Sequence, residues 1–250
     1  MKFVKRFKTE TDYNSYMGGD RLILPNISLI DEVSEMSEED SGVRFNSLKI
    51  TPEYEYVDLG LPSGLKWAKC NIGAEKESDY GLYFQWGDIV GYRGGETGKV
   101  FAWNTYKYCN GSKSTLTKYN TNSSYGIVDN LTTLEPSDDS ASVNMGGSWR
   151  MPSEEEYNEL LNNTTNTWTT VNGVNGRLFT GNNGNTLFLP ASGFSVVNVV
   201  SSVGYGGYYW SSTLDSSTPY ESWHLNFSSD DFTVENYRRD PGFSVRGVID

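Results

Sequence analysis

Short aromatic and aliphatic runs, separated by glycine, asparagine and serine, constrain the fold of this chain more than any other feature of its sequence. They recur from Tyr56 to the C-terminal end. The 250 residues include 26 Gly, 17 Tyr, 11 Phe and 7 Trp. Aromatic residues favour strands and glycine favours turns. The pattern therefore predicts many short strands, and the aromatic content excludes disorder over the whole length.

One segment carries strong helix signals. Ser153 and Glu156 form an S-x-x-E capping box, and an apolar face follows them. These signals predict a helix at about 153–162. Because strands are expected on both sides of it, we expect an α+β domain with mostly antiparallel strands. The runs predict a hairpin at 56–59 and 65–68, and strands at 83–86, 178–179, 187–189, 208–210, 223–227, 232–234 and 243–246.

The first fifty residues differ from the rest in composition. We expect residues 1–30 to form a docking arm with a short helix, 31–51 an acidic linker, and 52–250 one domain. A helix of about eight residues is too short to be stable alone, so its apolar face needs a partner surface. A solvated connector accounts for the acidic linker better than a binding motif. The expected docking side chains are Phe3, Phe7, Tyr13, Tyr16 and Met17.

The charge balance narrows the possible partners. The chain has 20 Lys and Arg against 32 Asp and Glu, a formal net charge of −12. Such a chain repels phosphate backbones and anionic lipid, so we expect no nucleic-acid partner and no membrane insertion. Charges at the N-terminus replace the apolar run of a secretion signal. We expect a protein that stays in the cell, leaves it by lysis, or has lost its signal.

Few residues are available for metal binding or catalysis. Cys70, Cys109 and His224 are the only cysteines and histidine, which is too few for a zinc ligand set. Strand alternation over 223–227 places His224 away from the core, as a solvated or binding-surface residue. We therefore expect no enzyme, no metal and no cofactor.

Several phrases resemble one known family. They are YVDLGLPSGLKWA at 56–68, TYKYC at 105–109, DSASVNMGGSWRMP at 139–152, YWSS at 209–212 and GFSVR at 242–246. Together they are similar to the Fibrobacter succinogenes major paralogous domain, over about 52–250. The resemblance implies a C-type-lectin-like fold, which is common in surface and adhesion proteins of gut Bacteroidetes and in proteins of their phages. It implies binding rather than catalysis.

The sequence departs from related groups at their metal and catalytic residues. Sugar-binding C-type lectins use Glu-Pro-Asn and Trp-Asn-Asp triplets as calcium ligands. This chain has Glu135-Pro136-Ser137 and Trp223-His224-Leu225 instead, so we expect no lectin-type calcium site. Formylglycine-generating enzymes use a nearby cysteine pair, and the two cysteines of this chain stand at unrelated positions.

The start of the chain resembles a second group. The phrase FKTETDYNSY at 7–16, followed by LPNIS at 24–28, is similar to the opening of virion proteins of crAss-like Bacteroides phages. This implies a virion surface protein, a head fibre or capsid decoration that can also bind a receptor. We expect it to assemble in the host cytoplasm, to dock on capsid or tail proteins and to form a homo-oligomer. The alternative is an adhesin module at the surface of a Bacteroidetes bacterium.

The resemblance places the variable ligand face before the last strand, at 214–240. Strand alternation puts His224 and Asn226 outward and leaves Trp223 equally suited to core or surface. Aromatic rings there would stack on a host cell-surface glycan or fill a protein pocket, and Arg238 with Arg239 would bind carboxylates. The expected ligand-binding residues are Tyr220, Trp223, His224, Asn226, Glu235, Asn236, Tyr237, Arg238 and Arg239.

Two further arginines stand alone in apolar phrases. Buried charges need partners, so we expect Arg150 and Arg246 to pair with buried carboxylates such as Asp58 or Asp139. A role in holding the fold is favoured over ligand binding.

Overall fold

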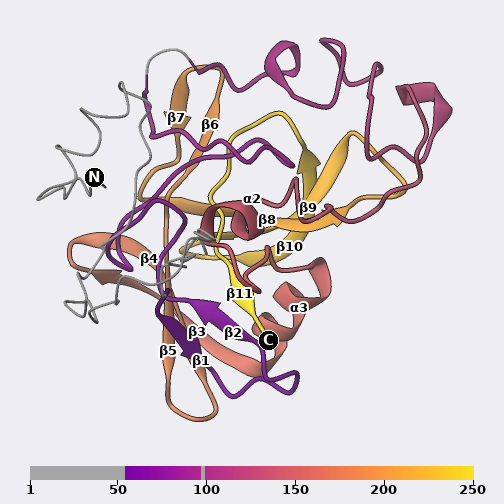
Figure 1. The fold of residues 1–250 in the computed structure, drawn as a ribbon. Coiled ribbons are helices and arrows are strands. Elements are labelled where there is room, and N and C mark those ends of the chain that lie inside the picture. The colour runs from indigo at the N-terminus through magenta and orange to yellow at the C-terminus, as the bar shows by residue number, and fades with distance from the viewer. Residues whose placement is uncertain (1–53, 97–98) are drawn as a thin grey trace, which may run out of the picture. The chain divides into compact units, whose positions relative to one another are not determined.

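The computed structural model describes residues 54–96 and 99–250, which belong to the second of the two units, 1–48 and 49–250, into which the chain divides (Figure 1). Its helices are the 3-10 turns η1 (Trp103–Thr105) and η2 (Ser123–Tyr125) and the α-helices α2 (Ser140–Met145) and α3 (Glu154–Asn163). Its strands are β1 (Tyr56–Asp58), β2 (Lys66–Ala68), β3 (Thr164–Val171), β4 (Val174–Gly181), β5 (Thr186–Pro190), β6 (Phe194–Val196), β7 (Val199–Ser201), β8 (Gly206–Leu214), β9 (Glu221–Ser228), β10 (Phe232–Arg238) and β11 (Val248–Ile249).

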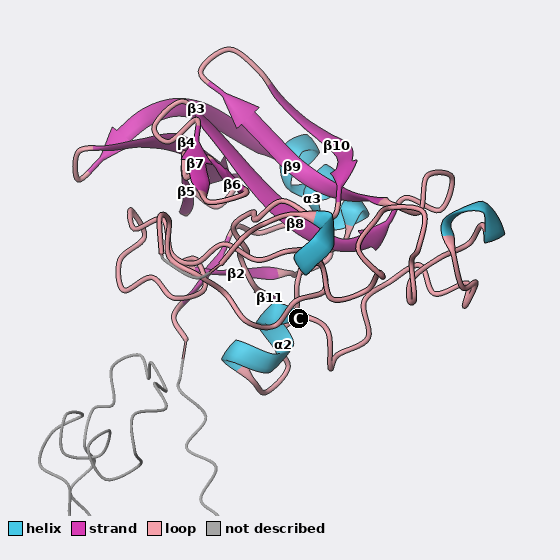
Figure 2. Cartoon of the chain, turned by 90° about the horizontal axis from the view of Figure 1, so that it is seen from above, coloured by secondary structure: helices cyan, strands magenta, loops and turns pink. Residues whose placement is uncertain are grey.

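The described strands form small antiparallel sheets. Three have three strands, in the orders β1-β2-β11, β10-β9-β8 and β3-β4-β5, and β6-β7 is a separate hairpin. Every named strand pair is antiparallel. Figure 2 shows that most of the chain between β2 and α2 is loop. The expected α+β class with mostly antiparallel strands is confirmed. No helix in the described ranges is both long and apolar enough to cross a membrane.

The expected early hairpin is present as β1 and β2. Gly60 and Gly64 have φ values of 67° and 78°, a conformation that glycine adopts without steric strain. The amide of Gly64 donates to the carbonyl of Leu61 at 2.9 Å and closes the turn. On the other side of β2, Val248 of β11 lies opposite Trp67. The two ends of the described chain therefore meet in one sheet.

Helix α3 begins and ends within one residue of the prediction. The hydroxyl of Ser153 accepts the amide of Glu156 at 3.2 Å, and the Glu156 carboxylate accepts the amide of Ser153 at 2.8 Å. This is the capping box that the sequence indicates. Tyr157 and Leu160 are buried on the apolar face, as expected.

The β8-β9-β10 sheet lies between two hydrophobic cores. Adjacent strand residues point to opposite faces, and the neighbours Tyr209 and Trp210 of β8 belong to different buried clusters. Tyr209 packs with Leu225 and with residues of α3, whereas Trp210 packs with Phe243. Both faces of this sheet are therefore covered near β8. Some of the expected site residues are buried for this reason.

Some expected elements differ in the structure. Segment 83–86 is no strand but makes isolated pairs, Tyr83 with Tyr92 and Phe84 with Phe243. Segment 243–246 pairs in the same isolated way, and the last strand is β11 instead. Strands β3, β6 and β7 and helix α2 were not expected. Strand β3 is rich in threonine and has no fully buried residue, so it lacks the apolar alternation that marks a strand.

The arginines expected to pair with Asp58 or Asp139 have other partners. The Arg150 guanidinium binds Glu156 at 2.6 Å and Asp250 at 2.9 Å. Asp139 caps α2 by accepting two backbone amides of that helix, and Asp58 accepts a backbone amide in the β1-β2 turn. Each carboxylate is already engaged by nearby backbone donors.

Arg246 has no carboxylate partner among the described residues. It is fully buried. Its Nε donates to Asn71 Oδ1 at 2.9 Å, and Nη1 donates to the carbonyls of Ala68 and Lys69 at 3.0 and 2.9 Å. Nη2 donates to the carbonyl of Phe188 at 3.2 Å. Neutral acceptors thus surround this charge in place of the expected carboxylate.

Candidate functional site

The β9-β10 hairpin carries most of the expected ligand-binding residues but divides them between two faces. Glu235 lies opposite His224, and Asn236 lies opposite Trp223. Because residues directly opposite each other share a face, the first pair and the second pair point to different sides of the sheet. The expected residues therefore do not converge on one surface.

The expectation that His224 is exposed is wrong. The side chain is 1% exposed. It packs against the rings of Tyr208, Trp210, Tyr237 and Phe243. Burial lowers the pKa of His224 to about 3, so the ring is neutral near pH 7 and makes no ion pair with Glu235. Alternation gives the correct face of the strand, but that face is covered by the segment that contains Phe243.

The expectation that Arg239 binds a ligand together with Arg238 is also wrong. Its side chain is fully buried, and the guanidinium lies 5.3 Å from the ring centres of both Trp86 and Tyr106. Arg238 is half exposed, and its Nε lies 3.0 Å from Asp240 Oδ1, in an ion pair whose alignment is too poor for a hydrogen bond. Arg239 is therefore not available to bind a carboxylate on a ligand.

Three expected residues lie at the other end of the hairpin. The Asn236 amide donates to Asp215 at 2.7 Å. The Tyr220 ring packs edge-on against Tyr125, 5.0 Å between centres, with the Lys113 ammonium 4.4 Å away. Trp223 is partly buried, so it is neither a core residue nor a fully exposed surface residue. These contacts fix the base of the hairpin, and none of the three residues lines the pocket that contains Asn226.

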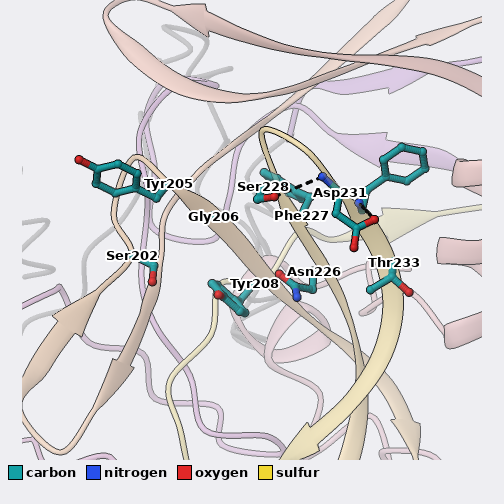
Figure 3. Close-up of a pocket in the computed structure, with 10 residues that line it drawn as sticks. Ser202, Tyr205, Gly206, Tyr208, Asn226, Phe227, Ser228, Asp231 and Thr233 are labelled. Carbon is teal, nitrogen blue, oxygen red and sulfur yellow. Dashed lines mark hydrogen bonds between the residues drawn. The ribbon is translucent and has the colours of Figure 1, made fainter.

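A pocket of about 200 Å³ opens at the tip of the β9-β10 hairpin. Figure 3 shows its lining, with Tyr205 on one side and Asp231 and Thr233 on the other. Tyr205 is 79% exposed and Phe232 is 39% exposed. Of the expected ligand-binding residues, only Asn226 lines this pocket. The lining residues are Ser202, Tyr205, Gly206, Tyr208, Asn226, Phe227, Ser228, Asp231, Phe232 and Thr233.

Arg177 of β4 holds the turn that forms one wall. Its Nη2 donates to the carbonyls of Ser228 at 2.6 Å and Asp231 at 3.2 Å. Its guanidinium also lies 4.7 Å from the ring centre of Phe232. The amide of Asp231 donates to the Ser228 hydroxyl at 3.3 Å (Figure 3). The turn is thereby fixed before any ligand arrives.

Two polar side chains on the floor of the pocket have defined orientations. The Asn226 amide nitrogen donates to Glu235 Oε1 at 2.7 Å, so its carbonyl oxygen remains as an acceptor. The Tyr208 ring packs between the pocket and the core, where it contacts Phe194 at 4.8 Å between centres. Burial raises the pKa of Tyr208, which keeps its hydroxyl protonated.

A second hollow, of about 680 Å³, is lined by residues on both sides of Ser202 in the sequence. Val203 lines it, whereas Ser202 and Tyr205 line the tip pocket. None of the expected ligand-binding residues lines the second hollow. Its other residues are Gly73, Glu75, Ser78, Asp79, Tyr80, Gly81, Tyr83, Arg93, Gly94, Val174 and Val200.

The tip pocket suits reversible binding through aromatic rings, hydroxyls and amide or carboxylate oxygens. In the described part of the chain, no group of three or more His, Cys, Asp or Glu is placed to hold a metal ion. Cys70 and Cys109 are both free thiols, and burial raises the pKa of each. The expected docking residues, Phe3, Phe7, Tyr13, Tyr16 and Met17, lie outside the described residues.

Sequence reasoning missed Tyr205, Ser202 and Thr233. The exposed Tyr205 stands in a Gly-Tyr-Gly-Gly phrase, and an aromatic residue flanked by turn residues is a signal that could have identified it. Comparison of the chain with family models, with curated proteins and with solved structures found no match.

Proposed function

We propose that this chain is a non-enzymatic binding protein whose C-terminal domain recognises a cell-surface ligand at the tip of the β9-β10 hairpin. The observation that carries the proposal is the tip pocket, which is lined by the exposed Tyr205 and by a turn that Arg177 fixes. A large aromatic ring left in solvent beside fixed polar groups contributes nothing to the core, but it is well suited to contact a partner.

The finer fold proposal is a C-type-lectin-like domain over residues 52–250. It rests on the phrases that resemble the Fibrobacter succinogenes major paralogous domain. These phrases supply residues to the hydrophobic cores of this chain. Trp67 of the first phrase, Met151 of the third and Trp210 of the fourth are all buried in the two cores. The small antiparallel sheets and the helix α3 are compatible with such a fold.

The wider setting that we propose is a phage particle. The chain would be a head fibre or capsid decoration that assembles as a homo-oligomer, docks by residues 1–30 on capsid or tail proteins and presents the domain outward. This rests on the resemblance of residues 7–28 to virion proteins of crAss-like phages.

Cell attachment tests the binding role. Fluorescently labelled full-length protein is incubated with intact cells of gut Bacteroidetes, and the bound fluorescence is measured for wild type, Tyr205→Ala and Tyr56→Ala. Tyr56 is a matched control because it is also an exposed tyrosine, on β1 and outside the pocket. We expect Tyr205→Ala to lose most attachment and Tyr56→Ala to keep it. Equal attachment of all three proteins would contradict the proposed site.

A further inference from the structure

We propose that the tip pocket accepts one sugar residue that carries no acidic group, either neutral or amine-bearing, and that it rejects acidic sugars. This rests on the proposed binding function and adds the chemical class of the ligand. It also reverses the sequence-based expectation that paired arginines bind carboxylates.

The size of the pocket favours a single ring. Pockets for drug-sized ligands enclose roughly 300–1,000 Å³, whereas the tip pocket has about 200 Å³. Tyr205 is the most exposed large hydrophobic residue in the described part of the chain, and its ring packs against no other aromatic ring there. Its free face is therefore available to stack on the C–H face of a sugar. Phe232, on the opposite wall, adds a second partly exposed ring.

The polar groups in the lining match hydroxyl groups better than charges. The Asn226 carbonyl oxygen is left as an acceptor because its amide nitrogen donates to Glu235. Ser202 and Thr233 supply hydroxyls, which both donate and accept. The Ser228 hydroxyl already accepts the amides of Asp230 and Asp231, so it remains as a donor. One carboxylate oxygen of Asp231 accepts the amide of Phe232 at 2.8 Å, and the other has no hydrogen-bond partner among the described residues. Sugar hydroxyls are donors and acceptors, so they complement this set.

The charge of the site excludes an acidic ligand. None of the ten lining residues is Lys, Arg or His. Asp231 lines the pocket, and the Glu235 carboxylate accepts a hydrogen bond from Asn226, which also lines it. The nearby guanidinium, that of Arg177, is engaged by backbone carbonyls and by the face of Phe232. A carboxylate, sulfate or phosphate on the ligand would therefore meet like charge without a partner, whereas an ammonium group would be attracted.

The test uses a glycan array that carries matched neutral, amine-bearing, sialylated and sulfated oligosaccharides, probed with the full-length protein. The variants are Tyr205→Ala with Tyr56→Ala as control, and Glu235→Gln with Glu155→Gln as control. Glu155 is an exposed carboxylate on α3, outside the pocket. Glutamine keeps the oxygen that Asn226 binds but removes the negative charge.

We expect binding to neutral or amine-bearing glycans, and binding about tenfold weaker to the sialylated or sulfated counterpart of any glycan that binds. Tyr205→Ala should weaken binding about tenfold, and Glu235→Gln should narrow the gap between neutral and acidic glycans. The control variants should change neither the strength of glycan binding nor the gap between neutral and acidic glycans.

Binding confined to acidic glycans, or the absence of any glycan binding, would overturn this inference. If the array is blank but cell attachment still depends on Tyr205, the proposed binding function stands and the ligand is a protein. If attachment is also independent of Tyr205, the proposed site fails as well.

Discussion

Arg246 and Arg239 are both fully buried, yet the protein accommodates the two guanidinium groups in different ways. Neither has a carboxylate within ion-pair distance among the described residues. All three nitrogens of Arg246 donate hydrogen bonds. Arg239 makes one hydrogen bond, from Nη1 to the carbonyl of Tyr119 at 3.0 Å, while its Nε and Nη2 have no partner.

The difference shows that neutral dipoles can replace a counter-ion beside a buried arginine, and that they do so more completely around Arg246 than around Arg239. Burial lowers the pKa of both arginines, but an arginine stays charged in proteins. Around Arg246, carbonyl oxygens take the place of water. Around Arg239, the faces of Trp86 and Tyr106 supply part of that stabilisation through their negative π surfaces. Arg246 therefore joins segments of the chain, whereas Arg239 mainly fills a space between rings.

Replacing Arg246 by methionine tests this contrast with the largest expected effect. The change leaves Asn71 Oδ1 and three backbone carbonyls without their donor, and each unsatisfied buried group costs about 1–3 kcal/mol. We expect the free energy of unfolding to fall by about 4 kcal/mol or more. Urea unfolding followed by tryptophan fluorescence measures it.

The control for this experiment is Arg93→Met, at an exposed arginine. It should change stability by less than about 0.5 kcal/mol. A loss below about 1 kcal/mol for Arg246→Met would show that the four acceptors find other donors, and it would remove the distinction between the two arginines.

His224 sharpens the comparison because it is a buried base that can lose its charge. Its pKa in the folded protein, about 3, lies below the ordinary histidine value of 6.5 because the ring is buried. As pH falls below about 6.5, the unfolded chain takes up a proton that the folded protein excludes, so stability decreases by roughly 1.4 kcal/mol for each pH unit. Between pH 7 and pH 5 this amounts to about 2 kcal/mol.

The variant His224→Phe isolates this effect, because His224 is the only histidine of the chain. Raised pKa values of carboxyl groups such as Glu154 and Glu221 act in the opposite direction in both proteins. The wild type should therefore lose more stability between pH 7 and pH 5 than the variant. Parallel stability profiles in urea unfolding at the two pH values would mean that the ring titrates normally.

Replacing Arg239 by methionine should have the smallest effect. The change removes one hydrogen bond and two cation–π contacts, but it also removes a buried charge with two unpartnered nitrogens. Because these terms oppose each other, we expect stability within about 1.5 kcal/mol of the wild type. Urea unfolding of the variant measures this difference in the free energy of unfolding. A loss as large as that of Arg246→Met would show that the aromatic faces stabilise a cation as well as four oxygens do.

Local chemistry could be predicted from the sequence, and long-range packing could not. The capping box of α3 and the glycine turn between β1 and β2 depend on a few adjacent residues, so both were predicted. Alternation in β9 correctly places Leu225 and Phe227 on the same face as Tyr209. It does not reveal that Phe243 covers the opposite face, and for this reason His224 was assigned to the surface.

The candidate site was predicted only in its region. The sequence indicated the β9-β10 segment and Asn226. The pocket also requires Tyr205 and Ser202, which precede β8, and Arg177, which belongs to another sheet. No periodic pattern within one segment identifies residues that tertiary packing brings together.

The pairing of β11 with β2 has a consequence for the timing of folding. Arg246, just before β11, binds the carbonyl of Ala68 across 178 residues of sequence. At synthesis rates of roughly 5–20 residues per second, β11 is made about 10–40 s after β2. During that interval one edge of β2 has unpaired backbone groups, which are prone to pair with other chains. The domain therefore completes its folding only after residue 249 has been made, and its nascent chain is most vulnerable to aggregation in the interval before that.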